Sequence, residues 1–281
     1  MNCAWEAYLR ILPQWMREPV DKLGRDRLQE IRIRLDQGPE LVMSGCANYL
    51  NRHVTASDIN YCLNAASQYS PWASATIQSG YITAAGGHRV GICGNVVTVG
   101  GKVSTISRVS SLCIRVARDF PGIGHSAASL SGSILILGSP GSGKTTLLRD
   151  LIRTKSNSGE TVCVVDERCE VFPFVENHFS FSEGKNTDVL SGCSKQYGLD
   201  VLIKTMNPDW VAADEITTES DCNALLHAGW CGVSLIATAH AAQLKDYLSR
   251  PVYKPLVNAD LFENIIVMQK DKTWTLERIN R

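Results

Sequence analysis

The sequence carries no excess of charge of either sign. Its 281 residues include 28 lysines and arginines and 28 aspartates and glutamates, so the formal net charge is zero. Such a chain has no overall field that attracts nucleic acid or an anionic membrane, and only local patches could do so. We therefore expect no nucleic-acid partner.

Long apolar runs are also missing. No run approaches the ~20 apolar residues that cross a bilayer, and the N-terminal stretch MNCAWEAYLRILPQW has no apolar core followed by a small-residue cleavage site. We expect neither a signal peptide nor a membrane span. The protein is then cytoplasmic, and it meets a membrane only through partners.

Paired cysteines are absent as well. The ten cysteines are scattered, and none forms a CxxC pair. Several lie in apolar strand or helix patterns, which is typical of buried free thiols in a reducing cytosol rather than of disulfides or a zinc site. The apolar content of 44% is enough for packed cores, and the length suggests about two domains.

What the chain does contain is a glycine-rich turn between an apolar run and a helical pattern. Residues 133–150 read SILILGSPGSGKTTLLRD, which has the spacing GxxxxGK[ST]. Glycines permit the close approaches by which consecutive N–H groups point at phosphate oxygens, and the next helix presents its positive end to the same anion. Lys144 adds charge for the β- and γ-phosphates, and the Thr145 hydroxyl is a ligand for Mg²⁺. The predicted phosphate cradle comprises Gly138, Ser139, Pro140, Gly141, Ser142, Gly143, Lys144, Thr145 and Thr146.

Residues before this turn indicate a smaller α+β domain. A strand pattern over 28–35 alternates apolar with charged residues, and a capped helix pattern follows Thr55. Residues 79–117 hold β-branched runs broken by paired glycines, which predicts an antiparallel sheet. We place this domain at 1–122 and a linker rich in glycine, serine and alanine at 123–131.

Beyond the linker, over 132–281, strand and helix patterns alternate. Continuous apolar strands that alternate with helices indicate an α/β domain with a mostly parallel sheet covered on both faces. Ligands of such sheets bind beyond the carboxyl ends of the strands. The predicted strands are 133–137, 161–166, 210–214 and 233–239, the predicted helices are 144–155, 187–206 and 218–229, and the tail is a hairpin of 265–268 with 273–279.

Polar side chains follow three of these strands. Strand 161–166 ends in the run DERCE. Packing alone is a poor explanation for so many charged residues at the end of a buried strand. Asp214 and Glu215 follow an apolar run, as in the second nucleotide motif, in which the aspartate holds the Mg²⁺ shell and the glutamate polarises the attacking water. His240 follows strand 233–239 and is either a structural histidine or a γ-phosphate sensor, because an imidazole N–H can bond a phosphate oxygen.

These motifs together resemble a known family. The phosphate loop, VVDERCE at 164–170, the DE strand end and ATAH at 237–240 occur in the order and spacing of the secretion ATPases, which power type II and type IV secretion and type IV pilus machines. SGYITAAGGHRVGICG at 79–94 and TDVLSGC at 187–193 resemble the sporulation branch of that family, found in endospore-forming bacteria. Asn186 departs from this branch, which tends to carry arginine before TDVL.

The resemblance implies a RecA-like ATPase domain over 132–281, assembled as a hexameric ring with ATP at the subunit boundaries. It also implies roles for further residues. Asp166 would join Thr145 and Asp214 at the metal, while Glu167 and Glu170 belong to the family's aspartate box, and either Glu215 or Glu170 activates water. Secretion ATPases send arginines from the N-terminal domain onto the phosphates, which makes candidates of three residues that alone are typical of a surface: Arg89, Arg108 and Arg115.

We therefore expect a Mg²⁺-dependent ATPase of the mother-cell cytoplasm that passes its domain motion to a membrane complex shared with the forespore. A rival is a nucleotide-gated assembly scaffold with negligible hydrolysis, since it would need the same binding residues. A DNA-translocating motor is disfavoured by the neutral charge and by the lack of an aromatic-basic stretch. A small-molecule kinase is disfavoured because no substrate-lid segment is apparent.

Overall fold

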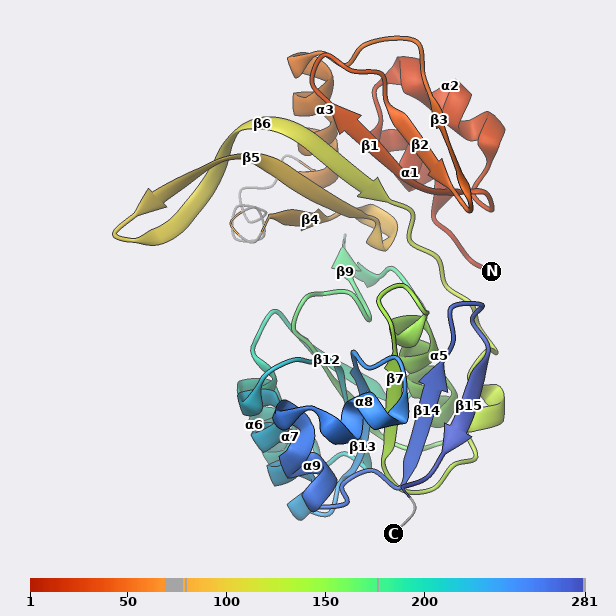
Figure 1. Ribbon diagram of the computed structural model, residues 1–281, viewed down its shortest axis with the longest axis vertical. Coiled ribbons are helices and arrows are strands. Elements are labelled where there is room, and N and C mark those ends of the chain that lie inside the picture. The colour runs from red at the N-terminus through yellow and green to blue at the C-terminus, as the bar shows by residue number, and fades with distance from the viewer. Residues whose placement is uncertain (69–77, 79, 176, 280–281) are drawn as a thin grey trace. The chain divides into compact units, whose positions relative to one another are not determined.

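The computed structural model describes residues 1–68, 78, 80–175 and 177–279, so Ser79 of the 79–94 segment lies outside the described residues. It divides into two compact units (Figure 1): Met1–Asp119 with Pro173–Phe181, and Phe120–Phe172 with Ser182–Arg281. The linker expected at 123–131 falls within the second unit. Pro173–Phe181, which the sequence placed in the C-terminal domain, belongs to the first.

The first unit contains an antiparallel sheet, as the 79–117 pattern predicts. The strands are β1 (Leu28–Arg34), β2 (Glu40–Met43), β3 (Cys46–Tyr49), β4 (Tyr81–Thr83), β5 (Arg89–Val99) and β6 (Lys102–Arg115). Their order in the sheet is β3-β2-β1-β6-β5-β4. At the turn between β5 and β6, Gly100 and Gly101 have φ of 58° and 77°, which a two-residue hairpin requires. A separate short hairpin consists of β9 (Phe174–Val175) and β10 (His178–Phe179).

Side-chain alternation gives the larger sheet one apolar face. Ile31 of β1 lies opposite Ile114 of β6, and both are fully buried. Glu30 and Arg32, on either side of Ile31, point to the opposite face and form an ion pair of 2.7 Å. The charged strand face that the sequence predicts is therefore the outer face of this sheet.

Three helices share a hydrophobic core with the apolar face: α1 (Trp5–Ile11), α2 (Gln14–Leu23) and α3 (Ala56–Ser67). Pro13 separates α1 from α2, because it occupies the N-cap of α2. The start of α3 is set by a complete capping box. Thr55 Oγ1 accepts the Asp58 N–H at 3.3 Å, and the Asp58 carboxylate accepts the Thr55 N–H at 2.9 Å.

His88, between β4 and β5, is a fully buried polar residue in this unit. Its Nδ1 accepts the Ala117 N–H at 3.0 Å, so Nε2 carries the proton and donates to the Ala4 carbonyl at 2.9 Å. The ring thereby ties the N-terminal segment to the end of β6. Burial lowers the pKa of His88 from 6.5 to about 4.

His88 makes the stability of the first unit pH-dependent. Between pH 6.5 and pH 4 the unfolded chain binds a proton at this position and the folded chain does not, so stability is complete above pH 6.5 and falls as the pH falls. The loss reaches roughly 3 kcal/mol at the lower pH. We expect His88→Gln to lose this part of the pH dependence. The measurement is the free energy of unfolding in urea at several pH values, followed by hydrogen exchange of the β5 and β6 amides. Equal pH dependence in the two proteins would show that His88 does not carry it.

The second unit contains a mostly parallel sheet. The strands are β7 (Ile134–Gly138), β8 (Val162–Asp166), β11 (Thr187–Ser191), β12 (Trp210–Ile216), β13 (Ser234–Ala239), β14 (Asn264–Met268) and β15 (Trp274–Glu277). Their order is β11-β8-β12-β13-β7-β14-β15, and only β15 runs antiparallel to its neighbour among these strands. Every residue of β7, β8 and β14 is buried, as expected for strands covered on both faces.

Helices cover both faces of this sheet (Figure 1). They are α5 (Lys144–Asn157), α6 (Lys195–Met206), α7 (Glu219–Trp230), α8 (Leu244–Ser249) and α9 (Lys254–Asn258). Helices α6 and α7 share the hydrophobic core of one face with β8, β12 and β13, while α5 contacts β7, β12 and β13 from the other. Within the described residues, none of the helices is both long enough and apolar enough to cross a bilayer.

The helix predicted over 187–206 is wrong in its first part. Thr187–Ser191 is strand β11, which pairs in parallel with the edge of β8. Gly192 then takes a φ of 75°, and α6 begins only after Ser194, whose side chain accepts the Tyr197 N–H as an N-cap. Pairing with an exposed strand edge outweighed a helical apolar pattern, which cannot reveal such a long-range partner.

Candidate nucleotide-binding and active site

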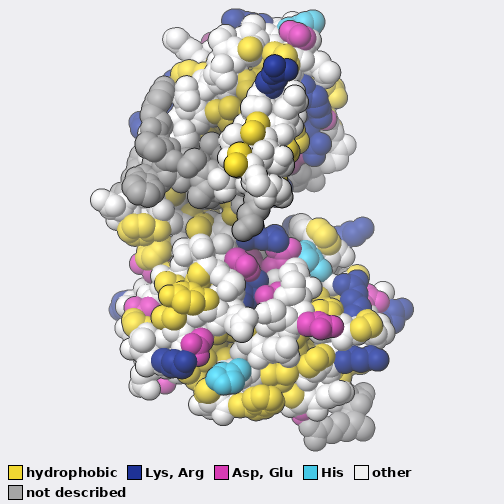
Figure 2. Space-filling model, turned by 90° about the vertical axis from the view of Figure 1, so that its left-hand side faces the viewer, with side chains coloured by type: hydrophobic (Ala, Val, Ile, Leu, Met, Phe, Trp, Pro, Cys, Tyr) yellow, Lys and Arg dark blue, Asp and Glu magenta, His cyan; other side chains and the backbone are white. Residues whose placement is uncertain are grey.

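The polar motifs meet at one edge of the second unit's sheet. Parallel strands β7, β8, β12 and β13 end at the same edge, and each is followed by a segment that the sequence singles out. Acidic and basic side chains lie close together on the surface of this unit (Figure 2). Topology therefore brings together residues that are far apart in the sequence.

The loop after β7 needs its glycines. A Cβ on Gly138 would lie 2.4 Å from Ser142 Oγ, so no larger residue fits there without a shift. Gly141 and Gly143 have φ of 73° and 103°, which favour glycine. Gly143 is the N-cap of α5, and no side chain caps that helix. The first N–H groups of α5 are thus left to an anion, whereas α3 and α7 have complete capping boxes.

The loop fits a bound phosphate on a further observation. Ser142 is 2% exposed, and its Oγ is buried with no hydrogen-bond partner among the residues that the structure describes. Buried hydroxyls are normally satisfied, and a phosphate oxygen would be a suitable partner. Together with the uncapped helix start, this favours an anion in the cradle.

Lys144 is the first residue of α5, and its side chain bonds to the loop. Its Nζ donates to the carbonyls of Gly138 at 3.0 Å and Ser139 at 3.1 Å, and it lies 3.1 Å from His240 Nδ1. Burial lowers the pKa of Lys144, although Asp214 and Glu215 act in the opposite direction. The ammonium is therefore held on the loop within reach of two strand ends.

Thr145 and Asp214 meet as the sequence predicts for two ligands of one metal. Thr145 Oγ1 donates to Asp214 Oδ2 at 2.8 Å. The Thr238 hydroxyl donates to the other carboxylate oxygen and accepts the Glu215 N–H at 2.8 Å. Hydroxyl and carboxylate oxygens are hard ligands of the kind that Mg²⁺ prefers, so this donor set fits that ion.

A bulge in β12 sets the direction of the Glu215 side chain. The pairing of β12 with β13 shifts register between Ala213 and Ile216, and Glu215 has a φ of 55°, in the left-handed region. Bulges and such backbone conformations concentrate at functional sites, where they redirect a side chain. Asp214 and Glu215 can therefore both face the loop, although neighbouring residues of a regular strand point to opposite faces.

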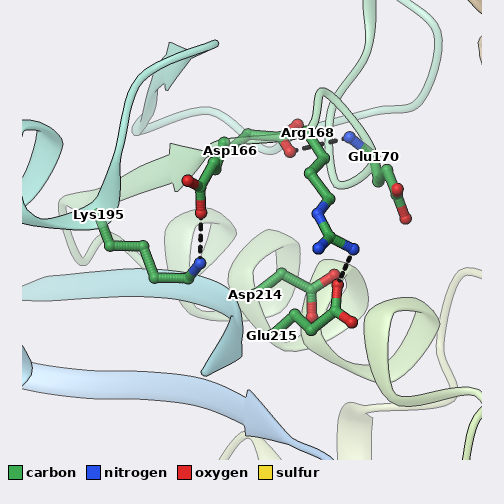
Figure 3. Close-up of a pocket in the computed structure, with 7 residues that line it drawn as sticks. Asp166, Arg168, Glu170, Lys195, Asp214 and Glu215 are labelled. Carbon is green, nitrogen blue, oxygen red and sulfur yellow. Dashed lines mark hydrogen bonds and ion pairs between the residues drawn. The ribbon is translucent and has the colours of Figure 1, made fainter. Parts of the chain in front are cut away.

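Glu215 lies between Arg168 and His240. One carboxylate oxygen accepts from Arg168 (Figure 3), and the other is 2.9 Å from His240 Nε2. Since Lys144 donates to Nδ1, the ring proton is on Nε2, and His240 donates to Glu215. A continuous hydrogen-bonded chain thus runs from Lys144 through His240 and Glu215 to Arg168.

Asp166 anchors the segment that follows β8. Its Oδ1 accepts the Glu170 N–H at 2.8 Å, and its Oδ2 accepts the N–H groups of Val171 at 3.0 Å and Phe172 at 2.9 Å. Burial raises the pKa of Asp166 to about 6, although these backbone bonds act in the opposite direction. The sequence predicts Asp166 as a metal ligand. Its three bonds to backbone N–H groups favour a further role, which is to hold the segment after β8.

The two glutamates of the aspartate box differ in their surroundings. Glu167 Oε2 accepts from Lys195 Nζ at 2.5 Å, and Lys195 is 4% exposed. Glu170 is held through its backbone, because Arg149 donates to the Glu170 carbonyl at 3.0 Å. Both glutamates line one pocket, whose full lining is Asp166, Glu167, Arg168, Glu170, Lys195, Asp214 and Glu215 (Figure 3).

The three candidate arginines lie in the first unit. Arg89 and Arg115 are cross-strand partners on β5 and β6, and the Arg89 guanidinium lies 4.1 Å from the centre of the Tyr81 ring. Arg108 is exposed and has a φ of 45° within β6, near a register shift. The structure brings Arg89 and Arg115 together and separates Arg108 from them along the hairpin.

Sequence reasoning missed several residues that support the site. Arg168 lies inside the charged run DERCE, and Thr238 lies two residues before His240, so both were visible in motifs but had no assigned role. Lys195 had no local signal, because its partners come from the segment after β8 and from α7. Lys272, in the turn before β15, donates to the Gly141 carbonyl.

Comparisons with known proteins agree with this geometry. A family model described as "Sporulation stage III, protein AA" matches residues 6–278. The stage III sporulation protein AA of Bacillus subtilis is 33% identical over 276 residues, which cover 93% of this chain and 90% of that protein. All the motifs of the sheet edge lie within the matched range, and α1 begins one residue before it.

Solved structures are similar over nearly the whole chain. The Legionella pneumophila ATPase DotB matches with a TM-score of 0.60 at 18% identity, covering 96% of this chain and 80% of that chain. The pilus retraction motor PilT with bound ADP matches with a TM-score of 0.63 at 14% identity, covering 100% of this chain and 84% of that chain. The predicted fold class is confirmed: a RecA-like α/β unit preceded in the chain by a smaller α+β unit.

Proposed function

Because the chain belongs to the sporulation stage III protein AA family, whose fold is that of the secretion ATPases, we propose that it binds ATP with Mg²⁺ and hydrolyses it. The observation that carries the proposal is the convergence of Lys144, the Thr145–Asp214 pair and the Glu215–His240 pair at one sheet edge. A glycine-rich loop alone would favour phosphate binding. The acidic pair beside it adds the groups that hydrolysis needs.

Each group has a distinct task in this proposal. The backbone amides at the start of α5 and the Lys144 ammonium bind the β- and γ-phosphates and neutralise their charge. Thr145 and Asp214 hold the metal, with Thr238 fixing the Asp214 carboxylate. Bound Mg²⁺ supplies further neutralisation of the phosphate oxygens.

Glu215 orients the attacking water and accepts its proton. Its position on the β12 bulge directs the carboxylate toward the loop, and His240 and Arg168 hold the carboxylate in one orientation. His240 also contacts Lys144. A γ-phosphate that binds Lys144 would weaken this contact, and the change would reach Glu215 because the same imidazole donates to it. This link supports His240 as a sensor of the γ-phosphate. Glu170, in the same pocket, remains the second candidate for water activation.

We further propose that the protein works as a hexameric ring of the mother-cell cytoplasm, attached to the membrane only through sporulation complex subunits. An arginine among Arg89, Arg108 and Arg115 would act across a subunit boundary. The solved relatives include a pilus retraction motor, which supports a mechanical role for this fold. ATP hydrolysis would move one unit relative to the other, and this motion would be passed to the membrane partners.

Phosphate release from ATP, measured with Mg²⁺ and with excess chelator, tests the proposal. Release that depends on Mg²⁺ is expected. ATP binding and assembly with no release would favour the nucleotide-gated scaffold, which shares every binding residue. Salt-sensitive binding to single-stranded DNA would favour the DNA-translocating motor instead.

A further inference from the structure

The turn between β14 and β15 places a second lysine at the phosphate loop. Strand β14 lies beside β7 in parallel, with Met268 paired with Gly138 (Figure 1). The end of β14 therefore lies beside the start of the phosphate loop. Gln269 to Thr273 forms the turn, which contains Lys270, Asp271 and Lys272.

The turn packs closely on the loop. A Cβ on Gly143 would lie 3.4 Å from Met268 Cε and 3.7 Å from Lys272 Cδ. Beyond Cδ, the Lys272 side chain reaches the tip of the loop, where its Nζ donates to the Gly141 carbonyl. An ammonium can donate three hydrogen bonds, so this bond leaves the group able to contact an anion on the same loop.

Local bonding in the turn sets the direction of Lys272. The Lys272 N–H donates to the Gln269 carbonyl at 3.1 Å, and the Gln269 N–H donates to the Thr273 carbonyl at 2.8 Å. Lys272 has a φ of 74°, an uncommon conformation for a residue other than glycine. The Asp271 carboxylate accepts the Thr273 N–H and hydroxyl at 3.0 and 2.7 Å, so it is directed toward Thr273.

The position of β14 indicates which part of a nucleotide Lys272 would meet. In the sheet, β7 lies between β13 and β14. The β13 side of the loop carries His240 and, from β12, Glu215, which the proposed function assigns to the γ-phosphate and the attacking water. The β14 side therefore faces the opposite end of the phosphate chain.

We propose that Lys272 binds the α- and β-phosphates of the nucleotide and acts as a second phosphate-loop lysine, delivered by the C-terminal hairpin. This inference rests on the proposed function. A contact to these two phosphates can form with both ATP and ADP, because it does not involve the γ-phosphate. It contributes uniform binding, which lowers Kd and KM and leaves kcat unchanged.

The test compares two lysines of the same turn. Lys272→Gln removes the charge and keeps a polar N–H group on a side chain one bond shorter, and Lys270→Gln is its matched control. Calorimetric titration with Mg·ADP and Mg·ATP should show Lys272→Gln binding both about tenfold more weakly, the size expected for one charge-assisted hydrogen bond. Lys270→Gln should bind as the unaltered protein does. KM should rise with kcat unchanged, and Lys272→Arg should restore most of the affinity.

Five results would overturn the inference. Equal affinity of Lys272→Gln and the unaltered protein would remove it and leave the proposed function in place. A loss confined to ATP, or a lower kcat at unchanged KM, would place Lys272 at the γ-phosphate. An equal loss in Lys272→Arg would assign the effect to packing. Failure of the unaltered protein to bind either nucleotide would overturn the proposed function and this inference with it.

Discussion

Lys144→Ala is expected to abolish phosphate release, with a loss of more than about 10²-fold. The alanine removes the cation at the centre of the phosphate loop and the contact that links the loop to His240. Lys272 also lies at the loop, but it donates to the Gly141 carbonyl and is assigned to the α- and β-phosphates, so it does not replace Lys144 at the γ-phosphate. Affinity for ATP should fall as well, and calorimetry and phosphate release measured together separate the two effects.

Lys204→Ala provides the matched control for this variant. Lys204 is an exposed lysine of α6 that pairs with Asp200 at 2.7 Å, and surface pairs of this kind contribute little. Thermal unfolding of both variants checks that removing the buried Lys144 leaves the second unit folded. Normal hydrolysis by a folded Lys144→Ala protein would remove the phosphate loop from the mechanism.

Glu215→Gln is expected to separate binding from chemistry. The amide keeps the size of the side chain but accepts a proton poorly, so turnover should fall by about 10²- to 10⁴-fold while ATP still binds. Single-turnover phosphate release and nucleotide titration measure the two properties. Glu219→Gln, at an exposed position in the first turn of α7, is the control and should keep full turnover.

The same series decides between the two candidate glutamates. If Glu215 activates water, Glu170→Gln should lose much less activity than Glu215→Gln. The reverse order would transfer the role to Glu170, which lies in the same pocket and whose backbone is held by Arg149 and Asp166.

The parts of the site that local sequence determines could be predicted. The loop from Gly138 to Thr145 is strand, turn and helix within one short segment, and its residue types follow from phosphate chemistry. Two separate motifs assign Thr145 and Asp214 to one metal, and the two side chains lie in contact because parallel strands that end at one edge bring such motifs together.

Long-range pairing explains what the sequence did not predict. Thr187–Ser191 is a strand only because the edge of β8 is available to it. The ion pair of Arg168 with Glu215 depends on the bulge in β12, which no local pattern announces. Lys272 reaches the phosphate loop because β14 pairs with β7 across a separation of more than a hundred residues in the chain, which residue spacing alone cannot reveal.

ATP turnover as a function of protein concentration, with particle mass measured in the same samples, tests the central claim most directly. The account predicts Mg²⁺-dependent turnover per chain that rises as the protein assembles, because an arginine from a neighbouring subunit completes each site. Glu215→Gln should assemble equally and stay inactive. Assembly in the presence of ATP with no turnover at any concentration would contradict the account and leave a nucleotide-gated scaffold in its place.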